Sequence, residues 1–287
     1  MHRIRAVALF PTIFTLGNLV CGFFAIVVAS RIPRPIDLPA GPSPRLESAR
    51  AWLQSLDPTH NLMLCGVLIF LAMLFDVFDG RVARIAKVTS DFGAQLDSLC
   101  DLVSFGVAPG ILLVKMCPQF AEIHSEASWT IAALFACCAA MRLARFNVET
   151  DEADDHAWFE GLPSPAAAAV IASSAILCFR MRSEVHFARF EEFDWYLQRI
   201  LPPVALVVGL LMVSRIPYPH AVTQLLRDKK SFPQLVAVVF ALMALWAVRW
   251  YAVPVLAVAY ALGPPSYYVW HWTSRRVRRR IGMRKAR

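Results

Sequence analysis

The chain has 287 residues, of which 57% are hydrophobic and only 17% are charged, and its mean hydropathy is +0.51. Soluble domains carry about 25% charged residues, so this composition excludes an ordinary soluble enzyme and indicates a polytopic membrane protein. Much of the formal net charge of +8 comes from a basic run near the C-terminus, RRVRRRIGMRKAR. No nucleic-acid-binding fold precedes that run, so we expect no nucleic-acid partner and place it beside membrane lipids, where basic residues anchor topology or bind anionic headgroups.

Apolar segments near the length of about 20 residues that a bilayer-spanning helix needs recur along the chain. We expect an all-α integral membrane protein with about eight transmembrane helices, at about 11–30, 61–79, 93–115, 129–147, 164–180, 200–214, 232–249 and 252–271. The fifth and sixth segments are short, and the break between the last two depends on Pro254. Residues 1–274 are expected to form a single catalytic membrane domain, because no soluble domain or clear internal repeat is visible.

The distribution of Lys and Arg predicts the orientation of the chain in the membrane. If the N-terminus lies inside, about two thirds of the Lys and Arg residues fall in inside segments, as the positive-inside rule requires. Both termini are then cytoplasmic, with residues 275–287 as a basic cytoplasmic tail. Residues 31–60 form an external Pro-rich loop.

Four aspartates stand close together in the segment DVFDGRVARIAKVTSDFGAQLDSLCD, flanked on both sides by apolar residues. Asp76 and Asp79 are three residues apart, and Asp97 and Asp101 are four apart, so each pair shares one face of a helix. A charge inside a bilayer costs roughly 2.5–3.5 kcal/mol on insertion scales and usually marks a functional site. Carboxylate oxygens suit hard divalent cations, so the four acids predict a site for Mg²⁺, Mn²⁺ or Ca²⁺.

The same segment resembles the signature of the CDP-alcohol phosphotransferase family, D-x2-D-G-x2-A-R-x8-G-x3-D-x3-D. All eight fixed positions are filled, by Asp76, Asp79, Gly80, Ala83, Arg84, Gly93, Asp97 and Asp101. The resemblance implies the family's helical membrane fold, a homodimer, and transfer of a substituted phosphate from a CDP-linked donor to an alcohol with release of CMP. It further implies two metal ions held by the aspartates, with Asp101 acting also as the general base. The spacing alone leaves open which of the four acids is the base.

Five further stretches are similar to the bacterial-type phosphatidylserine synthases of this family. They are PTIFTLGNLVCGFFAI, SFGVAPG, RLARFNV, FEGLPSPAAAA and SRIPYP. The similarity implies CDP-diacylglycerol and L-serine as substrates, with the site facing the cytoplasm of a bacterial inner membrane. The long loop at 31–60 departs from what is usual in this group, but it lies opposite the expected site.

Several residues around the aspartates are candidates for binding the nucleotide and its phosphates. Gly80 and Gly93 lack side chains, so a nucleotide can approach closely there, although glycines in membrane helices also serve helix packing. Arg84 can neutralise a phosphate, or it can be an interfacial cation. Thr15 and Asn18 share one helix face and are expected either to bind cytidine or phosphate or to form a polar pair between helices.

Other polar residues are candidates for binding the acceptor alcohol. Arg142 and Arg145 stand one helical turn apart and, with Asn147, can hold the serine carboxylate or a lipid phosphate, or they can serve as positive-inside anchors. Ser104 follows Asp101 by three residues and either contacts the acceptor or hydrogen-bonds within its own helix.

Three alternative functions remain open at this point. A family member can use another acceptor, such as glycerol phosphate or inositol phosphate, but such an acceptor needs an additional basic pocket. A prenyltransferase also uses aspartate pairs and Mg²⁺, but on separate helices. A cation transporter also carries intramembrane acids, but near broken helices at the bilayer midplane.

Overall fold

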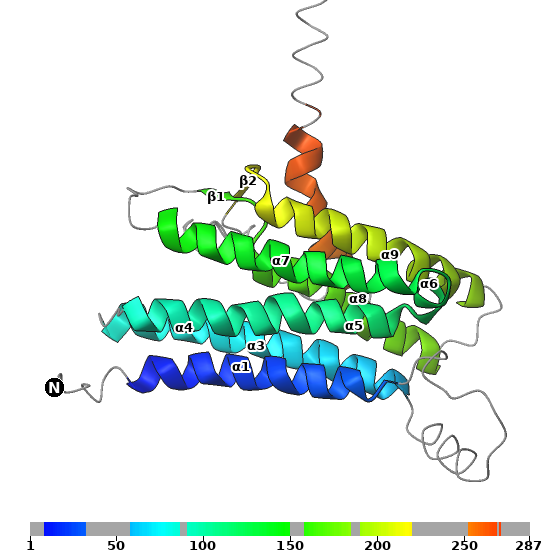
Figure 1. Cartoon of the computed structure of the whole chain (residues 1–287), viewed down its shortest axis with the longest axis horizontal. Coiled ribbons are helices and arrows are strands. Elements are labelled where there is room, and N and C mark those ends of the chain that lie inside the picture. Colours follow the sequence, from blue (N-terminus) through cyan, green and yellow to red (C-terminus); the bar gives the residue numbers. More distant parts are fainter. Residues whose placement is uncertain are drawn as a thin grey trace, which may run out of the picture.

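The structure is a computed structural model and describes residues 9–32, 58–86, 91–149, 158–184, 190–219, 252–268 and 270. It is nearly all-helical (Figure 1). In chain order the elements are α1 (Leu9–Ser30), α3 (Pro58–Ala86), α4 (Asp91–Asp101), η3 (Leu102–Val107), α5 (Ala108–Met116), α6 (Pro118–Ile123), α7 (Ser125–Glu149), β1 (Trp158–Glu160), α8 (Ser164–Glu184), α9 (Phe190–Val213) and β2 (Pro217–Pro219). Residues 252–268 are also helical.

Among the described residues, six helical segments are long and apolar enough to cross a membrane. They are Thr12–Ser30, His60–Gly80, Phe92–Met116, Ser125–Val148, Ser164–Arg182 and Glu192–Val213. These six match the first six predicted spans, so the chain is an integral, multi-pass membrane protein. The predicted count of eight is not confirmed. The seventh predicted span, 232–249, lies outside the described residues, and the helix at 252–268 is not among the six.

The third span is a single rod built from three consecutive elements, α4, η3 and α5 (Figure 1). The middle element is a π-helix, in which each N–H bonds the carbonyl five residues earlier rather than four. Short π-turns inside α-helices occur frequently at functional sites. Here the π-turn begins directly after Asp101, the last aspartate of the predicted metal site.

Close packing of the rod against α1 depends on a glycine. A Cβ added to Gly22 of α1 would lie 2.2 Å from Oγ and 2.8 Å from Cα of Ser104 in η3. Small residues allow membrane helices to approach closely, and hydrogen bonds between helices then add to the packing. At this crossing the Ser104 hydroxyl donates to the backbone oxygen of Asn18 over 3.0 Å. The contact fixes the π-turn relative to α1.

The described residues also contain one short pair of antiparallel strands, which the all-α prediction lacked. Phe159 of β1 pairs with Tyr218 of β2, and the flanking partners are Trp158 with Pro219 and Glu160 with Pro217. Sequence patterns did not reveal β2 because prolines cannot donate ladder hydrogen bonds and argue against a strand. The pairing joins the FEGLPSP and SRIPYP stretches, which are far apart in the sequence.

A glycine in a left-handed conformation allows the chain to leave β1 and enter α8. Gly161 has φ of +79°, and a Cβ there would lie 2.5 Å from the backbone oxygen of Met212. Its N–H donates to the oxygen of Ile216 over 2.9 Å, and the N–H of Leu162 donates to the oxygen of Leu211 over 3.0 Å. The start of α8 is therefore bonded to the end of α9 through backbone groups.

Candidate active site

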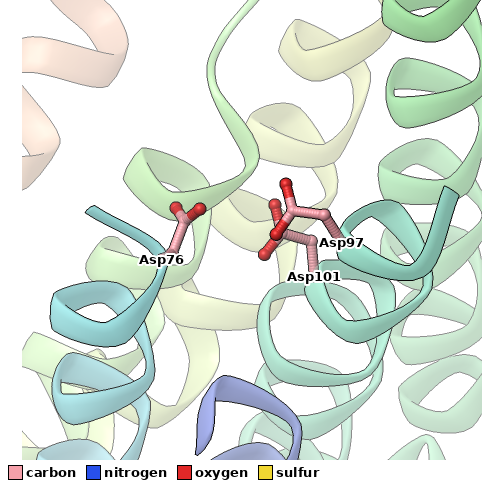
Figure 2. Close-up of side chains that lie close together, drawn as sticks. All are labelled: Asp76, Asp97 and Asp101. Carbon is pink, nitrogen blue, oxygen red and sulfur yellow. The ribbon is translucent and has the colours of Figure 1, made fainter. Parts of the chain in front are cut away.

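Three of the predicted metal-binding acids converge at one end of the helix bundle. One carboxylate oxygen from each of Asp76, Asp97 and Asp101 lies within 4.8 Å of the other two. Figure 2 shows Asp76 extending from one helix toward Asp97 and Asp101, which project from successive turns of another. Helical spacing places the last two on one face of α4. Asp76 comes from α3, and α1 packs against both α3 and α4, which brings the three acids together.

The fourth acid, Asp79, is buried but lies outside this group of three. Its Oδ2 accepts a hydrogen bond from the Thr15 hydroxyl of α1. Asp101 has a similar contact with α1, because Nδ2 of Asn18 donates to Oδ1 of Asp101 over 2.8 Å. Thr15 and Asn18 therefore contact acids on two other helices, which agrees with the interhelical alternative for this pair.

The donor set fits a divalent cation. All three converging groups are carboxylates, the ligand type that hard ions prefer. Oδ1 of Asp97 is buried and has no hydrogen-bond partner within the described part of the chain. Buried polar atoms are normally satisfied, so an exception within an acidic cluster indicates a ligand for that oxygen. The acid cluster, defined here as Asp76, Asp97 and Asp101, could therefore bind a metal ion.

A cation of α7 lies beside the acid cluster. The guanidinium of Arg142 interacts electrostatically with the carboxylates of Asp76 and Asp101. Its Nη1 donates to Oγ of Ser164 over 2.9 Å. Its Nε is buried and has no hydrogen-bond partner among the described residues, so this donor is available to an anionic ligand.

The other two predicted acceptor residues on α7 have different neighbours. Nη2 of Arg145 donates to the backbone oxygen of Val213 over 2.8 Å, at the end of α9. Nδ2 of Asn147 donates to Oγ of Ser98 on α4 over 2.9 Å. Arg142 thus lies beside the acids, while Arg145 and Asn147 connect α7 to the helices around the site.

The remaining predicted site residues are placed as follows. Ser104 contacts α1 rather than its own helix, through the hydrogen bond to Asn18. Gly80 is exposed, and a Cβ there would meet no atom within 4 Å. Gly93 lies in α4. Arg84 lies in α3, and its side chain lies outside the described part of the structure.

Two residues beside Arg142 were not predicted as site residues. Ser164 has a recognisable signal, because it stands between two prolines at the start of a helix, PSP, but that pattern predicts a helix start rather than a site. Tyr260 lies near Arg142 and belongs to the helix at 252–268. No pattern in its apolar surroundings indicates this contact, which depends on tertiary packing.

Comparison with known proteins identifies relatives across bacteria and archaea. Residues 8–211 match the family model described as CDP-alcohol phosphatidyltransferase. The CDP-diacylglycerol–serine O-phosphatidyltransferase of Helicobacter pylori is 30% identical over 218 residues, covering 76% of this chain and 74% of the relative. The Bacillus subtilis protein of the same name is 29% identical over 222 residues, 73% of this chain and 89% of the relative. The archaetidylserine synthase of Methanothermobacter thermautotrophicus is 35% identical over 170 residues, 58% of this chain and 62% of the relative.

Proposed function

The chain belongs to the CDP-alcohol phosphatidyltransferase family, and we propose that it transfers the phosphatidyl group of CDP-diacylglycerol to L-serine. The products are phosphatidylserine and CMP. The observation that carries the proposal is the acid cluster with Arg142 beside it, because this arrangement can hold a diphosphate through metal and an amino-acid carboxylate through a guanidinium. The relatives named above, all named for serine products or substrates, support serine as the acceptor.

The proposed reaction is a direct phosphoryl transfer. The serine hydroxyl oxygen bonds to the phosphorus that carries diacylglycerol, and the bond from that phosphorus to the CMP oxygen breaks. The hydroxyl proton passes to the carboxylate of Asp101, which acts as general base. CMP leaves with the electron pair of the broken bond. A carboxylate in this role needs one oxygen directed at the hydroxyl, and the bond from Asn18 to Oδ1 leaves Oδ2 for it.

Divalent metal completes the proposed site. Asp76, Asp79, Asp97 and Asp101 would hold two ions of Mg²⁺ or Mn²⁺, with Ca²⁺ as a further option, and the metal would neutralise charge on the diphosphate and on the departing CMP. Asp79 has one oxygen bonded to Thr15 and offers the other to such an ion. Thr15 and Asn18 then act by orienting two of these carboxylates rather than by contacting cytidine.

Substrate binding is proposed on two sides of the acids. We propose that the nucleotide approaches at Gly80 and Gly93, where it meets no side chain, and that Arg84 binds a phosphate. Serine binds on the side of Arg142, whose buried Nε can donate to the serine carboxylate. Arg145 fixes the end of α9, and Ser104 fixes the π-turn, so we assign both to the support of the site.

We also propose that the acid cluster faces the cytoplasm of a bacterial-type inner membrane, with both termini on that side. The distribution of Lys and Arg along the sequence supports this orientation. A homodimer stays a prediction from the family resemblance, and chemical cross-linking in membranes would test it.

The decisive experiment assays purified protein with CDP-diacylglycerol and a panel of alcohols. We expect CMP release with L-serine to exceed that with glycerol phosphate or inositol phosphate. Ethanolamine keeps the hydroxyl and the amine of serine but lacks the carboxylate, so it should be a very poor acceptor. Asp97→Asn serves as the inactive control, and Glu122→Gln, at an exposed position of α6, as the matched active control. Faster turnover of a phosphorylated alcohol would overturn the serine assignment while leaving the phosphotransferase chemistry intact.

A further inference from the structure

The two strands lie close in sequence to the residues that accept hydrogen bonds from the arginines of α7. Arg142 bonds Ser164, the first residue of α8, and Ser164 follows β1 by four residues. Arg145 bonds the backbone oxygen of Val213, the last residue of α9, and Val213 precedes β2 by four residues. Since β1 pairs with β2, the two arginines and the strand pair form one connected unit. We call β1, β2, Arg142 and Arg145 the strand clamp.

The helix at 252–268 packs against the strand clamp. Tyr218 at the centre of β2 is fully buried, and its hydroxyl donates to the backbone oxygen of Ala261 over 2.9 Å. Its ring lies 5.9 Å from the ring of Tyr260, centroid to centroid. Ala261 is likewise fully buried, so this part of the helix is docked into the protein core. Tyr260 also lies near Arg142, so the helix at 252–268 approaches the acid cluster.

This support lies outside the part of the chain that matches the family model. The match ends at residue 211, before β2, Tyr218 and the helix at 252–268. The acids and the helices that carry them lie within the match. The residues that hold the arginines in place on the acceptor side therefore come in part from beyond it, and a family that shares its donor and varies its acceptor can vary there.

We propose that β2 and the helix at 252–268 determine acceptor selectivity, with Tyr218 and Tyr260 as positioning residues that hold Arg142 toward the carboxylate of the acceptor. The inference rests on the proposed function. Arg142 contacts the acceptor, whereas the two tyrosines act through Arg142 and the strand clamp. A fixed guanidinium favours a planar carboxylate, because its donors are arranged in a rigid fork. If the contacts within the strand clamp are weakened, the guanidinium of Arg142 is no longer fixed in orientation and the affinity for serine falls. Binding of CDP-diacylglycerol at the donor site on α3 and α4 is unaffected.

Two conservative variants of the full-length protein, Tyr260→Phe and Tyr218→Phe, test the proposal. Each removes one hydroxyl and keeps the ring. Tyr218→Phe removes the hydrogen bond to Ala261, and Tyr260→Phe removes the polar group near Arg142. Loss of one hydrogen bond changes binding by about 2–10-fold. We expect KM for serine to rise by that factor, with kcat and KM for CDP-diacylglycerol changed less than about twofold, and the ratio of serine to ethanolamine turnover to fall. Tyr267→Phe and Tyr268→Phe are matched controls, because both tyrosines are exposed on the same helix.

The outcomes separate this proposal from a purely structural role. An unchanged KM for serine in Tyr260→Phe overturns it, and so does an equal rise in both KM values together with lower thermal stability. Tyr260→Phe keeps the bond from Tyr218 to Ala261, so it decides the matter if Tyr218→Phe fails to fold. If the unmodified protein prefers a phosphorylated alcohol, the serine assignment fails. The same variants measured with that alcohol then test the role of the strand clamp in acceptor selectivity. A selective rise in the KM for that alcohol supports this role, and an unchanged KM overturns it.

Discussion

Two charged groups lie at opposite ends of the helix bundle, and they are built in different ways. Near the end of α8, Arg182 donates to both oxygens of Asp194, with Nη2 at 2.9 Å from Oδ1 and 3.2 Å from Oδ2. Nε2 of Gln198 donates to the same carboxylate over 2.6 Å. One positive charge thus meets one negative charge, and further hydrogen bonds satisfy the acid. This network connects α8 to α9 and needs no additional ligand.

The acid cluster has the opposite balance. Three carboxylates converge within 4.8 Å, while Arg142 is the cation found near them in the described part of the chain. Like charges held together in an apolar setting destabilise a fold, so this arrangement favours a positively charged ligand between the carboxylates. The comparison teaches that charge balance, rather than charge burial, distinguishes the proposed active site from the structural ion pair.

The largest expected effect is that of removing one charge from the acid cluster. Asp97→Asn should lower turnover by at least about 10³-fold, because metal ions contribute several kcal/mol of transition-state stabilisation. Thermal stability of the metal-free protein should not fall, because the substitution relieves repulsion. EDTA should abolish CMP release reversibly, with recovery on adding Mg²⁺ or Mn²⁺. Full activity in the presence of the chelator would contradict a metal site.

The second-largest effect is expected from removing the proposed general base, Asp101. Asp101→Asn should lower kcat by about 10²–10⁴-fold if the residue serves chiefly as general base. CDP-diacylglycerol should still bind, which equilibrium binding of a labelled nucleotide lipid can measure. A loss of nucleotide binding as large as that of Asp79→Asn would instead make Asp101 chiefly a metal ligand.

At the opposite end, the prediction is a loss of stability without a loss of chemistry. Arg182→Met leaves Asp194 without its cation, and breaking a buried ion pair costs about 3–5 kcal/mol. The two side chains are 21% and 18% exposed, so we expect the lower end of that range. Thermal unfolding in detergent should occur at lower temperature, while turnover per folded molecule stays unchanged. The double variant Arg182→Met with Asp194→Leu should regain most of the stability. Lost turnover at unchanged stability would contradict the structural role.

The smallest effect is expected at the cation beside the acids. Arg142→Lys keeps the charge but loses the planar fork, so KM for serine should rise by about 10-fold, the lower end for hydrogen bonds to charged groups. KM for CDP-diacylglycerol should change less, as initial rates at varied donor concentration can show. A rise in KM confined to CDP-diacylglycerol would instead assign Arg142 to the binding of the donor.

The sequence predicted the helical fold, and the structure brings three of the four predicted acids together, for a physical reason. Asp76, Asp97 and Asp101 belong to a motif whose helical spacing sets their faces, and apolar flanking residues make such charges conspicuous. The partners of Thr15 and Asn18 could not be predicted, because they depend on how α1 packs against α3 and α4. Spacing also could not separate Asp79 from the group of three.

Long-range contacts of polar residues were equally hidden. Arg182 and Asp194 lie on different helices, and neither stands in a recognisable motif. Tyr218 lies between two prolines, a pattern that argues against the strand it occupies. In each case the packing of helices against one another determines which residue is the partner, and the periodicity of a sequence carries no information about that packing.

The π-turn after Asp101 has a consequence for how this span tolerates changes in length. In a regular α-helix each residue turns the chain by about 100°, so a single insertion or deletion re-aims every side chain beyond it. A π-turn takes up one more residue than an α-turn within the same helix. Deleting one residue within Leu102–Val107 can therefore restore a regular helix while Asp97 and Asp101 keep their direction relative to α5. The third span has room for a one-residue change of register next to its most constrained side chains.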